Sequence, residues 1–231
     1  MSNFYNKYIT YKNLYLNLQR NKVSKENINF SDKNKQFGGK KNIIIHISGP
    51  SGSGKTTLGN KLKDRFGDKI IVKDIDDLRQ EFIKQFYGNK KWTIIDKDAY
   101  QKYIDDFVNR QTKPIIFVGL NNMFWWHKNH YYNMHPTYKY YIRIDDKIIL
   151  KQKCLRLFDD LKDDKVAMDD LVNNNGTFIK MVKQGIEREC SMKNNLWEIN
   201  KWNKDYKKQG YKFMTRENIF NKVSNLIENR L

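Results

Sequence analysis

The residues with the clearest chemistry in this 231-residue chain form one short run of glycine, hydroxyl and lysine side chains, GPSGSGKT at 49–56. Its spacing is GxxxxGK[ST], in which glycines let successive backbone N–H groups turn toward an anion. The lysine then reaches the β- and γ-phosphates, and the last hydroxyl ligates Mg²⁺. A glycine-rich turn without a ligand would have to match these residue types by accident. The run therefore predicts a nucleotide site with these contact residues: Gly49, Ser51, Gly52, Ser53, Gly54, Lys55, Thr56 and Thr57.

Three acidic side chains and an arginine follow the loop: Asp74, Asp76, Asp77 and Arg79. Asp77 has a glutamine three residues later and fits a capping box, which would explain one acid structurally. We expect Asp74 to hold Mg²⁺ with Thr56, and Asp76 to accept the proton of an attacking hydroxyl. Arg79 is expected to pair with a phosphate of the acceptor.

Strands and helices must position these groups. A β-branched run at 42–48 leads into the loop, and the helix that opens at Lys55 stops at Gly67. Further strands are expected at 69–72, 113–120, 140–144 and 210–214. Helices are expected before Gly88 and at 96–110. A helix, a lid and a second helix are expected over 145–164, and a closing helix after a Thr215 cap. The order predicts a three-layer α/β domain with a parallel sheet of about five strands.

The stretch from Ile43 to Gln85 resembles the small P-loop kinases, which include shikimate kinase, gluconate kinase, zeta-type toxins and the kinase domain of phage polynucleotide kinase. The resemblance implies a P-loop NTPase fold, ATP and Mg²⁺ as cofactors, and phosphate transfer. Asp74-Ile75-Asp76 is similar to the DxD of shikimate kinase, which contacts magnesium and the substrate hydroxyl. The sequence DDLRQ at 76–80 resembles the DDYRQ of phage polynucleotide kinase, whose first Asp is the general base and whose Arg binds a substrate phosphate. Related kinases with other acceptors also carry D-x-x-R here, so the match identifies the superfamily better than the acceptor.

Two later segments depart from this family pattern. Many relatives end the strand that corresponds to 113–120 in an acidic residue that positions magnesium through water, whereas this strand ends in Gly119 and Leu120. The departure raises the importance of Asp74 for the metal. Relatives also place two or more arginines in the lid, where this chain offers Arg156, with Lys153 behind it, as the candidate clamp for the transferring phosphate.

The first 41 residues form a distinct basic tract before the expected 42–231 kinase domain, and residues 1–40 hold +6 of the net charge. Aromatic and leucine side chains recur there at helical spacing: Phe4, Tyr8, Tyr11, Tyr15 and Leu18. The pattern predicts a short helix followed by a flexible linker with Gly38-Gly39. The tract YNKYITYKNLYLNLQ, with FGGKK after it, resembles N-terminal tracts on many proteins of giant DNA viruses. That resemblance implies an addressing or packaging element with Gly38-Gly39 as a processing point; the alternative is a helix docked on the domain.

The chain carries 44 Lys and Arg against 26 Asp and Glu, a net charge of +18. This charge favours anionic partners such as nucleotides, nucleic acids or lipid headgroups, although AT-rich coding would also produce part of it. We expect neither a membrane span nor a secretory signal, and hence an intracellular, cytoplasmic protein, or one in a viral factory or virion. Cys154 and Cys190 follow no metal or redox spacing and fit a reducing compartment.

An aromatic and histidine-rich patch lies at 124–136, FWWHKNHYYNMHP. Its three histidines lack nearby cysteines for a metal site. Trp125, Trp126, Tyr131 and Tyr132 could stack a nucleobase or form a small aromatic core.

The sequence as a whole predicts an ATP- and Mg²⁺-dependent phosphotransferase. Its acceptor would be a nucleoside, a nucleotide or a nucleic-acid 5′-hydroxyl. The alternative is a non-catalytic or NTP-switched nucleotide-binding protein attached through its basic N-terminal tract. The acceptor and the oligomeric state are not determined by the sequence.

Overall fold

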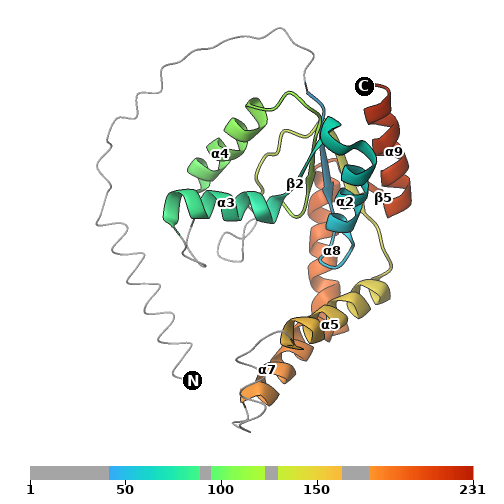
Figure 1. The fold of residues 1–231 in the computed structure, drawn as a ribbon. Helices are drawn as coiled ribbons and strands as arrows, with labels where there is room; N and C mark the ends of the chain where they lie inside the picture. Colours follow the sequence, from blue (N-terminus) through green and yellow to red (C-terminus); the bar gives the residue numbers. More distant parts are fainter. Residues whose placement is uncertain (1–41, 89–94, 123–129, 163–176, 231) are drawn as a thin grey trace. The chain divides into compact units, whose positions relative to one another are not determined.

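The computed structural model describes residues 42–88, 95–122, 130–162 and 177–230 (Figure 1). The helix and linker expected in the N-terminal tract, and the boundary after residue 41, fall outside this range and stay predictions. Trp125, Trp126 and His127 also lie outside it.

The described part contains a five-stranded parallel sheet in the order β2-β3-β1-β4-β5. The strands are β1 (Ile44–Ser48), β2 (Ile71–Asp74), β3 (Ile115–Val118), β4 (Tyr138–Ile142) and β5 (Lys212–Met214). β1 and β3 are buried at every residue, as expected for β-branched strands covered on both faces of a parallel sheet. The expected strands and the parallel arrangement are confirmed.

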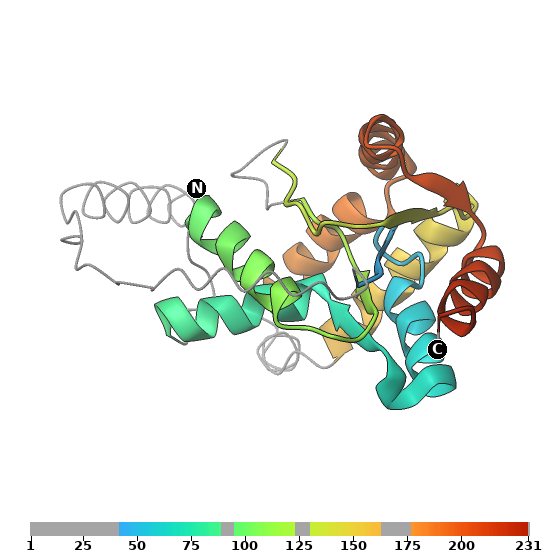
Figure 2. The same ribbon diagram turned by 90° about the horizontal axis from the view of Figure 1, so that it is seen from above.

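Helices cover both faces of the sheet (Figures 1 and 2). α2 (Lys55–Phe66) and α9 (Arg216–Glu228) pack their apolar side chains against one face. α3 (Ile75–Tyr87) and α4 (Lys97–Asn109) pack against the other face, and α8 (Met192–Lys208) contributes Tyr206 to a smaller aromatic core with Tyr141 and Tyr211. The result is a three-layer α/β arrangement.

Two helix starts have side-chain caps, and the one at Thr215 confirms the cap that the sequence predicts. Asp96 accepts a hydrogen bond from the Ala99 N–H at 2.8 Å at the start of α4. Thr215 accepts one from the Asn218 N–H at 3.3 Å at the start of α9. Each side chain satisfies a backbone donor that has no partner within its helix.

The sequence predicts a helix, a lid and a second helix over 145–164. This prediction is wrong. Most of that segment is a single helix, α5 (Asp146–Lys162), which contains neither glycine nor proline to interrupt it. Further helical segments follow at α7 (Thr177–Gly185), in a π-helical turn at Ile186–Cys190, and in α8.

The two cysteines are joined in a disulfide, which corrects the expectation that they remain unpaired thiols. Cys154 lies in α5 and Cys190 closes the π-helical turn, with their Cα atoms 5.2 Å apart. The bond therefore ties α5 to the segment that leads into α8. Such pairing of residues 36 apart in the chain has no signature in the cysteine spacing.

The parallel sheet, with the glycine-rich loop between its central strand β1 and α2, has the P-loop NTPase fold. Among the residues that the structure describes, no helix has both the length and the apolar character needed to cross a membrane.

Candidate active site

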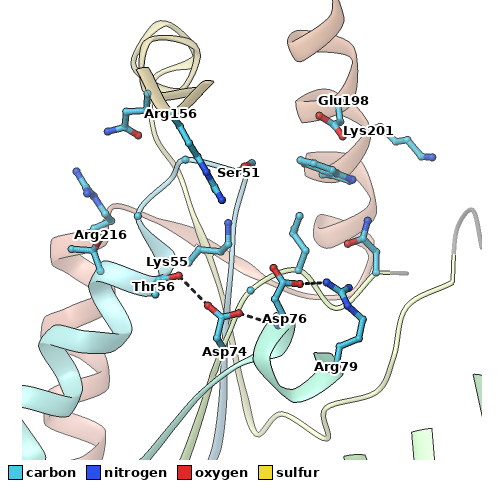
Figure 3. A pocket seen from close by; sticks show the side chains of 18 of the residues that line it. Ser51, Lys55, Thr56, Asp74, Asp76, Arg79, Arg156, Glu198, Lys201 and Arg216 are labelled. Atoms are coloured by element: carbon cyan, nitrogen blue, oxygen red, sulfur yellow. Dashed lines mark hydrogen bonds and ion pairs between the residues drawn. The ribbon is translucent and has the colours of Figure 1, made fainter. Parts of the chain in front are cut away.

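A cavity of about 1050 Å³ opens at the carboxyl ends of the strands, where ligands bind in open α/β sheets. Figure 3 shows the glycine-rich loop on one side of it and α8 on the other, with Asp76 and Arg79 of α3 between them. The cavity is lined by the following residues: Ser51, Gly52, Gly54, Lys55, Thr56, Thr57, Asp74, Asp76, Arg79, Gly119, Leu120, Asn122, Tyr131, Gln152, Arg156, Trp197, Glu198, Lys201, Trp202 and Arg216.

The structure thus brings together most of the residues that the sequence singled out. Of the contact residues predicted in the loop, Gly49 and Ser53 do not line the cavity. Ser53 is buried, and a Cβ added to Gly49 would lie 2.8 Å from the Ser53 hydroxyl. The two residues pack against each other on the side of the loop away from the cavity, and this packing leaves no room for a side chain at Gly49.

The loop presents its backbone to the cavity. Gly52 and Gly54 have φ angles of 79° and 80°, in the left-handed region that favours glycine. α2 begins directly after Gly54 with no side-chain cap on its first N–H groups. An uncapped helix N-terminus that faces a cavity carries a partial positive charge and unused donors, which suits an anion such as a phosphate.

Lys55 lies folded across the loop. Its ammonium donates to the carbonyl oxygens of Gly49 at 3.0 Å and Pro50 at 2.8 Å. Burial lowers the pKa of Lys55 to about 8, with Asp76 and Asp74 acting in the opposite direction. A phosphate placed in the loop would favour the charged ammonium and raise this pKa again.

Asp74 connects the loop to the second strand. The Thr56 hydroxyl donates to Asp74 Oδ2 at 3.0 Å, and the Asp76 N–H donates to Asp74 Oδ1 at 3.0 Å. Asp74 is therefore the N-cap of α3, and the cap expected at Asp77 is wrong. The helix begins three residues earlier than a cap at Asp77 predicts, because Asp74 at the strand end already supplies the acceptor.

The Thr56 and Asp74 oxygens fit a magnesium ion. Mg²⁺ takes hard oxygen ligands, and adjacent oxygens about 2.1 Å from it in an octahedral shell lie about 3.0 Å apart. The Thr56 Oγ1 and Asp74 Oδ2 atoms have this separation. Such an ion keeps waters and substrate phosphates as its other ligands. The described residues contain no group of three or more His, Cys, Asp or Glu side chains that could hold a metal ion.

The end of β3 leaves space for Asp74. A Cβ added to Gly119 would lie 3.4 Å from Asp74 Oδ1 and 3.1 Å from the Ile75 Cβ, and its φ of 131° is one that other residues rarely adopt. The end of β3 thus carries a glycine packed against the acid of the neighbouring strand. Asp74 is the acidic residue that faces Thr56 here.

A buried histidine holds the Gly119 backbone. His46 Nε2 donates to the Gly119 carbonyl at 3.1 Å, and its Nδ1 accepts from the Tyr211 hydroxyl at 2.5 Å. A carbonyl accepts only, so the proton is on Nε2. Burial lowers the pKa of His46 to about 4. A neutral imidazole therefore links β1 to the end of β3 and to the residue that precedes β5.

Asp76 and Arg79 form an ion pair at the first turn of α3. Their environments differ, because the Arg79 side chain is only 10% exposed whereas the Asp76 side chain is 67% exposed. The buried guanidinium is held in place, while the carboxylate reaches into the cavity near Lys55 (Figure 3). The pair can offer one oxygen to a reacting hydroxyl and a fixed cation to an anionic acceptor.

Arg216 is a cavity residue that sequence reasoning missed. A Cβ on Gly54 would lie 2.7 Å from its Nη1 atom, so the guanidinium packs directly against the loop. Figure 3 places Arg216 and Arg156 on the side of the cavity away from α8. Arg216 follows the Thr215 cap, at the carboxyl end of β5, and that position was the available signal.

Lys153, which the sequence predicts behind Arg156 at the transferring phosphate, does not line the cavity. It is buried, and it donates to Asn195 Oδ1 at 2.5 Å and to Glu198 Oε2 at 3.5 Å. These bonds fasten α5 to α8, so Lys153 supports the wall of the cavity. Arg156 lines the cavity itself.

The two described tyrosines of the 124–136 patch divide between cavity and core. Tyr131 lines the cavity and donates to Asp205 at 2.7 Å, whereas Tyr132 is buried against α4. Two tryptophans of α8, Trp197 and Trp202, line the cavity as well. Sequence reasoning did not single them out, since α8 itself was not predicted.

Comparison with known proteins gives one useful likeness. No protein-family model matches the chain. A protein of Methanocaldococcus jannaschii described as "Putative adenylate kinase" is 27% identical over 171 residues, which cover 70% of this chain and 78% of that protein. Together with the parallel sheet, this likeness fits a P-loop kinase-like fold.

Proposed function

We propose that this protein is an ATP-dependent phosphotransferase that acts on a nucleoside, a nucleotide or a nucleic-acid 5′-hydroxyl. The observation that carries the proposal is the placement of three groups around one cavity: the uncapped loop with Lys55, the Thr56–Asp74 pair and the Asp76–Arg79 pair. The likeness to the protein described as "Putative adenylate kinase" supports phosphate transfer between nucleotides as the kind of reaction.

The loop side of the cavity would bind the phosphates of ATP. The N–H groups at the start of α2 and the Lys55 ammonium face the space where the β- and γ-phosphates would lie. Arg156 and Arg216 add positive charge on the same side, where it would offset charge on the transferring phosphoryl group. The donor nucleotide therefore occupies the end of the cavity away from α8.

Thr56 and Asp74 would hold Mg²⁺, which when bound neutralises phosphate charge and orients the phosphate oxygens. Asp74 also caps α3, and this places the first turn of α3 beside the metal ligands. The position of Asp76 thus depends on the same residue that would bind the ion.

Asp76 would accept the proton of the acceptor hydroxyl. The hydroxyl oxygen forms a bond to the γ-phosphorus, the bond from that phosphorus to the β–γ bridging oxygen breaks, and ADP leaves with the electron pair. The proton moves to the Asp76 carboxylate. Arg79, already paired with Asp76, would contact a phosphate of the acceptor and bring its hydroxyl to the carboxylate.

Incubation of the full chain with γ-labelled ATP, Mg²⁺ and a panel of acceptors tests the proposal. The panel contains a nucleoside, nucleoside monophosphates and oligonucleotides with a 5′-hydroxyl. We expect label on an acceptor, and no label with a Lys55→Met variant. ATP binding without transfer to any acceptor would overturn the kinase and favour the NTP-switched binding protein.

A further inference from the structure

We propose that the outward face of α8 binds single-stranded nucleic acid and guides its end into the cavity. The inference deepens the proposed function and rests on it, because it identifies the acceptor of the phosphotransferase as a nucleic-acid end. It starts from side chains of α8 that take no part in the catalytic roles assigned above.

Four lysines and one tryptophan lie on one face of α8. They follow one another at spacings of four, four, three and four residues: Lys193, Trp197, Lys201, Lys204 and Lys208. At about 100° per residue, these positions fall within an arc of about 80°. We call this set the α8 stripe.

The α8 stripe faces away from the protein core. Asn195, Ile199 and Tyr206 are buried and lie on the opposite side of the helix. Lys193, Lys204 and Lys208 are exposed, and Lys201 is half-buried at the cavity. The stripe therefore presents a row of positive charges to solvent.

Trp197 gives the stripe a surface for stacking. Its side chain is 70% exposed, although it lines the cavity. The Lys201 ammonium lies 5.8 Å from the centre of the indole ring, which leaves an aromatic face beside a cation. Exposed aromatic rings between lysines suit unpaired bases and the phosphates that connect them.

The acidic residues of α8 are already engaged away from the stripe. The helix contains two, and Glu198 accepts from Lys153 while Asp205 accepts from Tyr131. Acidic side chains are therefore absent from the stripe positions themselves, and Glu198 and Asp205 point to partners on other elements. The charged side chains at the stripe positions are all lysines, which suits contact with a phosphate backbone.

The length and course of the stripe match a short single strand. From Lys193 to Lys208 it spans about 22 Å at 1.5 Å per residue, a span on the order of four nucleotides. Trp197 and Lys201 lie at the cavity wall facing the loop, whereas Lys204 and Lys208 continue along the helix. A strand bound there would place its terminal nucleotide near Asp76 and Arg79. A duplex would keep its bases stacked and leave Trp197 without a partner, so a single strand fits best.

The test measures binding of a fluorescent 5′-hydroxyl oligonucleotide to the full chain over a salt series. For Lys204→Ala/Lys208→Ala we expect weaker binding and a salt slope smaller by about 0.7 for each phosphate that no longer binds a lysine. Trp197→Ala should weaken binding about tenfold, and Trp197→Phe should restore most of it. ATP affinity in the Lys204→Ala/Lys208→Ala variant should equal wild type, because neither residue lines the cavity.

A matched control removes the same charge elsewhere. Lys61 and Lys63 are exposed on α2, so Lys61→Ala/Lys63→Ala should affect oligonucleotide binding much less. Equal effects of the two double variants would show a general charge effect and overturn the inference. Binding of anionic vesicles, but not of oligonucleotides, through the stripe would overturn it too.

The experiment separates the inference from the function on which it rests. Phosphate transfer to mononucleotides with no stripe-dependent oligonucleotide binding would remove the nucleic-acid acceptor and leave the kinase. Stripe-dependent oligonucleotide binding without transfer to any acceptor would remove the kinase and leave a nucleic-acid-binding surface.

Discussion

The Thr56 hydroxyl donates a hydrogen bond of 3.0 Å to Asp74 Oδ2, which joins the first turn of α2 to the end of β2. Asp74 uses its other oxygen to cap α3. One carboxylate thus fixes the loop helix and the helix that carries Asp76 and Arg79. Different substitutions at this position can remove the proposed magnesium ligand while keeping the helix cap, or remove both.

Asp74→Asn is expected to raise the Mg²⁺ concentration needed for turnover by at least tenfold. Asparagine caps a helix as well as aspartate does, so α3 should remain in place, but the neutral amide is a poorer ligand for Mg²⁺. Magnesium titrations of the rate would measure the change. Asp74→Ala should lose thermal stability in addition, on the order of 1 kcal/mol, because it removes the cap. Equal Mg²⁺ requirements in wild type and Asp74→Asn would contradict the assignment.

Lys55→Met should abolish turnover and stabilise the fold. Burial of the ammonium lowers the pKa of Lys55 to about 8, so the charged group destabilises the folded state. Its removal should raise the free energy of unfolding on the order of 1 kcal/mol, and the melting temperature by several degrees. Between pH 8 and 10.5 the unfolded chain holds a proton on Lys55 that the folded chain has lost. Wild-type stability should therefore rise with pH in this range.

The pH dependence is the control for this variant. In Lys55→Met the rise above pH 8 should disappear, since the titrating group is gone. Urea unfolding at pH 8, 9 and 10 measures this pH dependence of the free energy of unfolding in both proteins. A variant that is less stable than wild type at every pH would show that the lysine stem contributes more than its charge costs.

Asp76→Asn should lower kcat by about 10² to 10⁴ while ATP affinity stays near wild type, because a general base acts mainly in the transition state. Asp77→Asn is the matched control, since Asp77 is exposed and does not line the cavity. It should retain most of the activity. If Asp77→Asn were the inactive variant and Asp76→Asn the active one, the base would be misassigned.

His46 is expected to make the fold sensitive to acid. The unfolded chain takes up a proton near pH 6.5, whereas the buried imidazole resists protonation down to about pH 4. Stability should therefore fall as the pH drops through this window, by about 3 kcal/mol over its full width.

NMR of the His46 ring checks this prediction directly. The folded protein should show a neutral Nε2–H tautomer at pH 5. Tyr211→Phe removes the hydroxyl that donates to Nδ1, so it should raise the pKa of His46 and flatten the fall in stability. An imidazolium at pH 5 in the folded wild type would refute the account.

The parts of the fold and site that the sequence predicts are those encoded by neighbouring residues. The loop, α2 and the strand before it follow one another in the chain, so their motif and periodicity predict them together. The sequence predicts the parallel sheet of about five strands, whereas the order of those strands comes from the structure. Asp74 lies only 18 residues beyond Thr56, and each residue sits at a strand or helix end that the pattern predicts.

The remaining cavity wall depends on packing between distant segments. Arg216 and Trp197 reach the cavity because α9 and α8 pack on opposite faces of the sheet, and no local pattern encodes that placement. The prediction of a lid within 145–164 was wrong for a related reason. α5 is uninterrupted in sequence, and its partners, α8 and the turn at Cys190, come more than thirty residues later.

Gly119 determines how magnesium would enter the proposed enzyme. Because β3 ends in a glycine, Asp74 is the acidic group that Thr56 contacts at the end of the loop, and a single carboxylate is a weak chelator of a well-hydrated ion. The free protein would hold little magnesium, and the ion would arrive already complexed to ATP. The kinetically competent donor would then be the preformed Mg·ATP complex, and uncomplexed ATP would act as a competitive inhibitor. The rate would thus follow the ratio of magnesium to ATP in the surroundings, a dependence that a second acid on β3 would weaken.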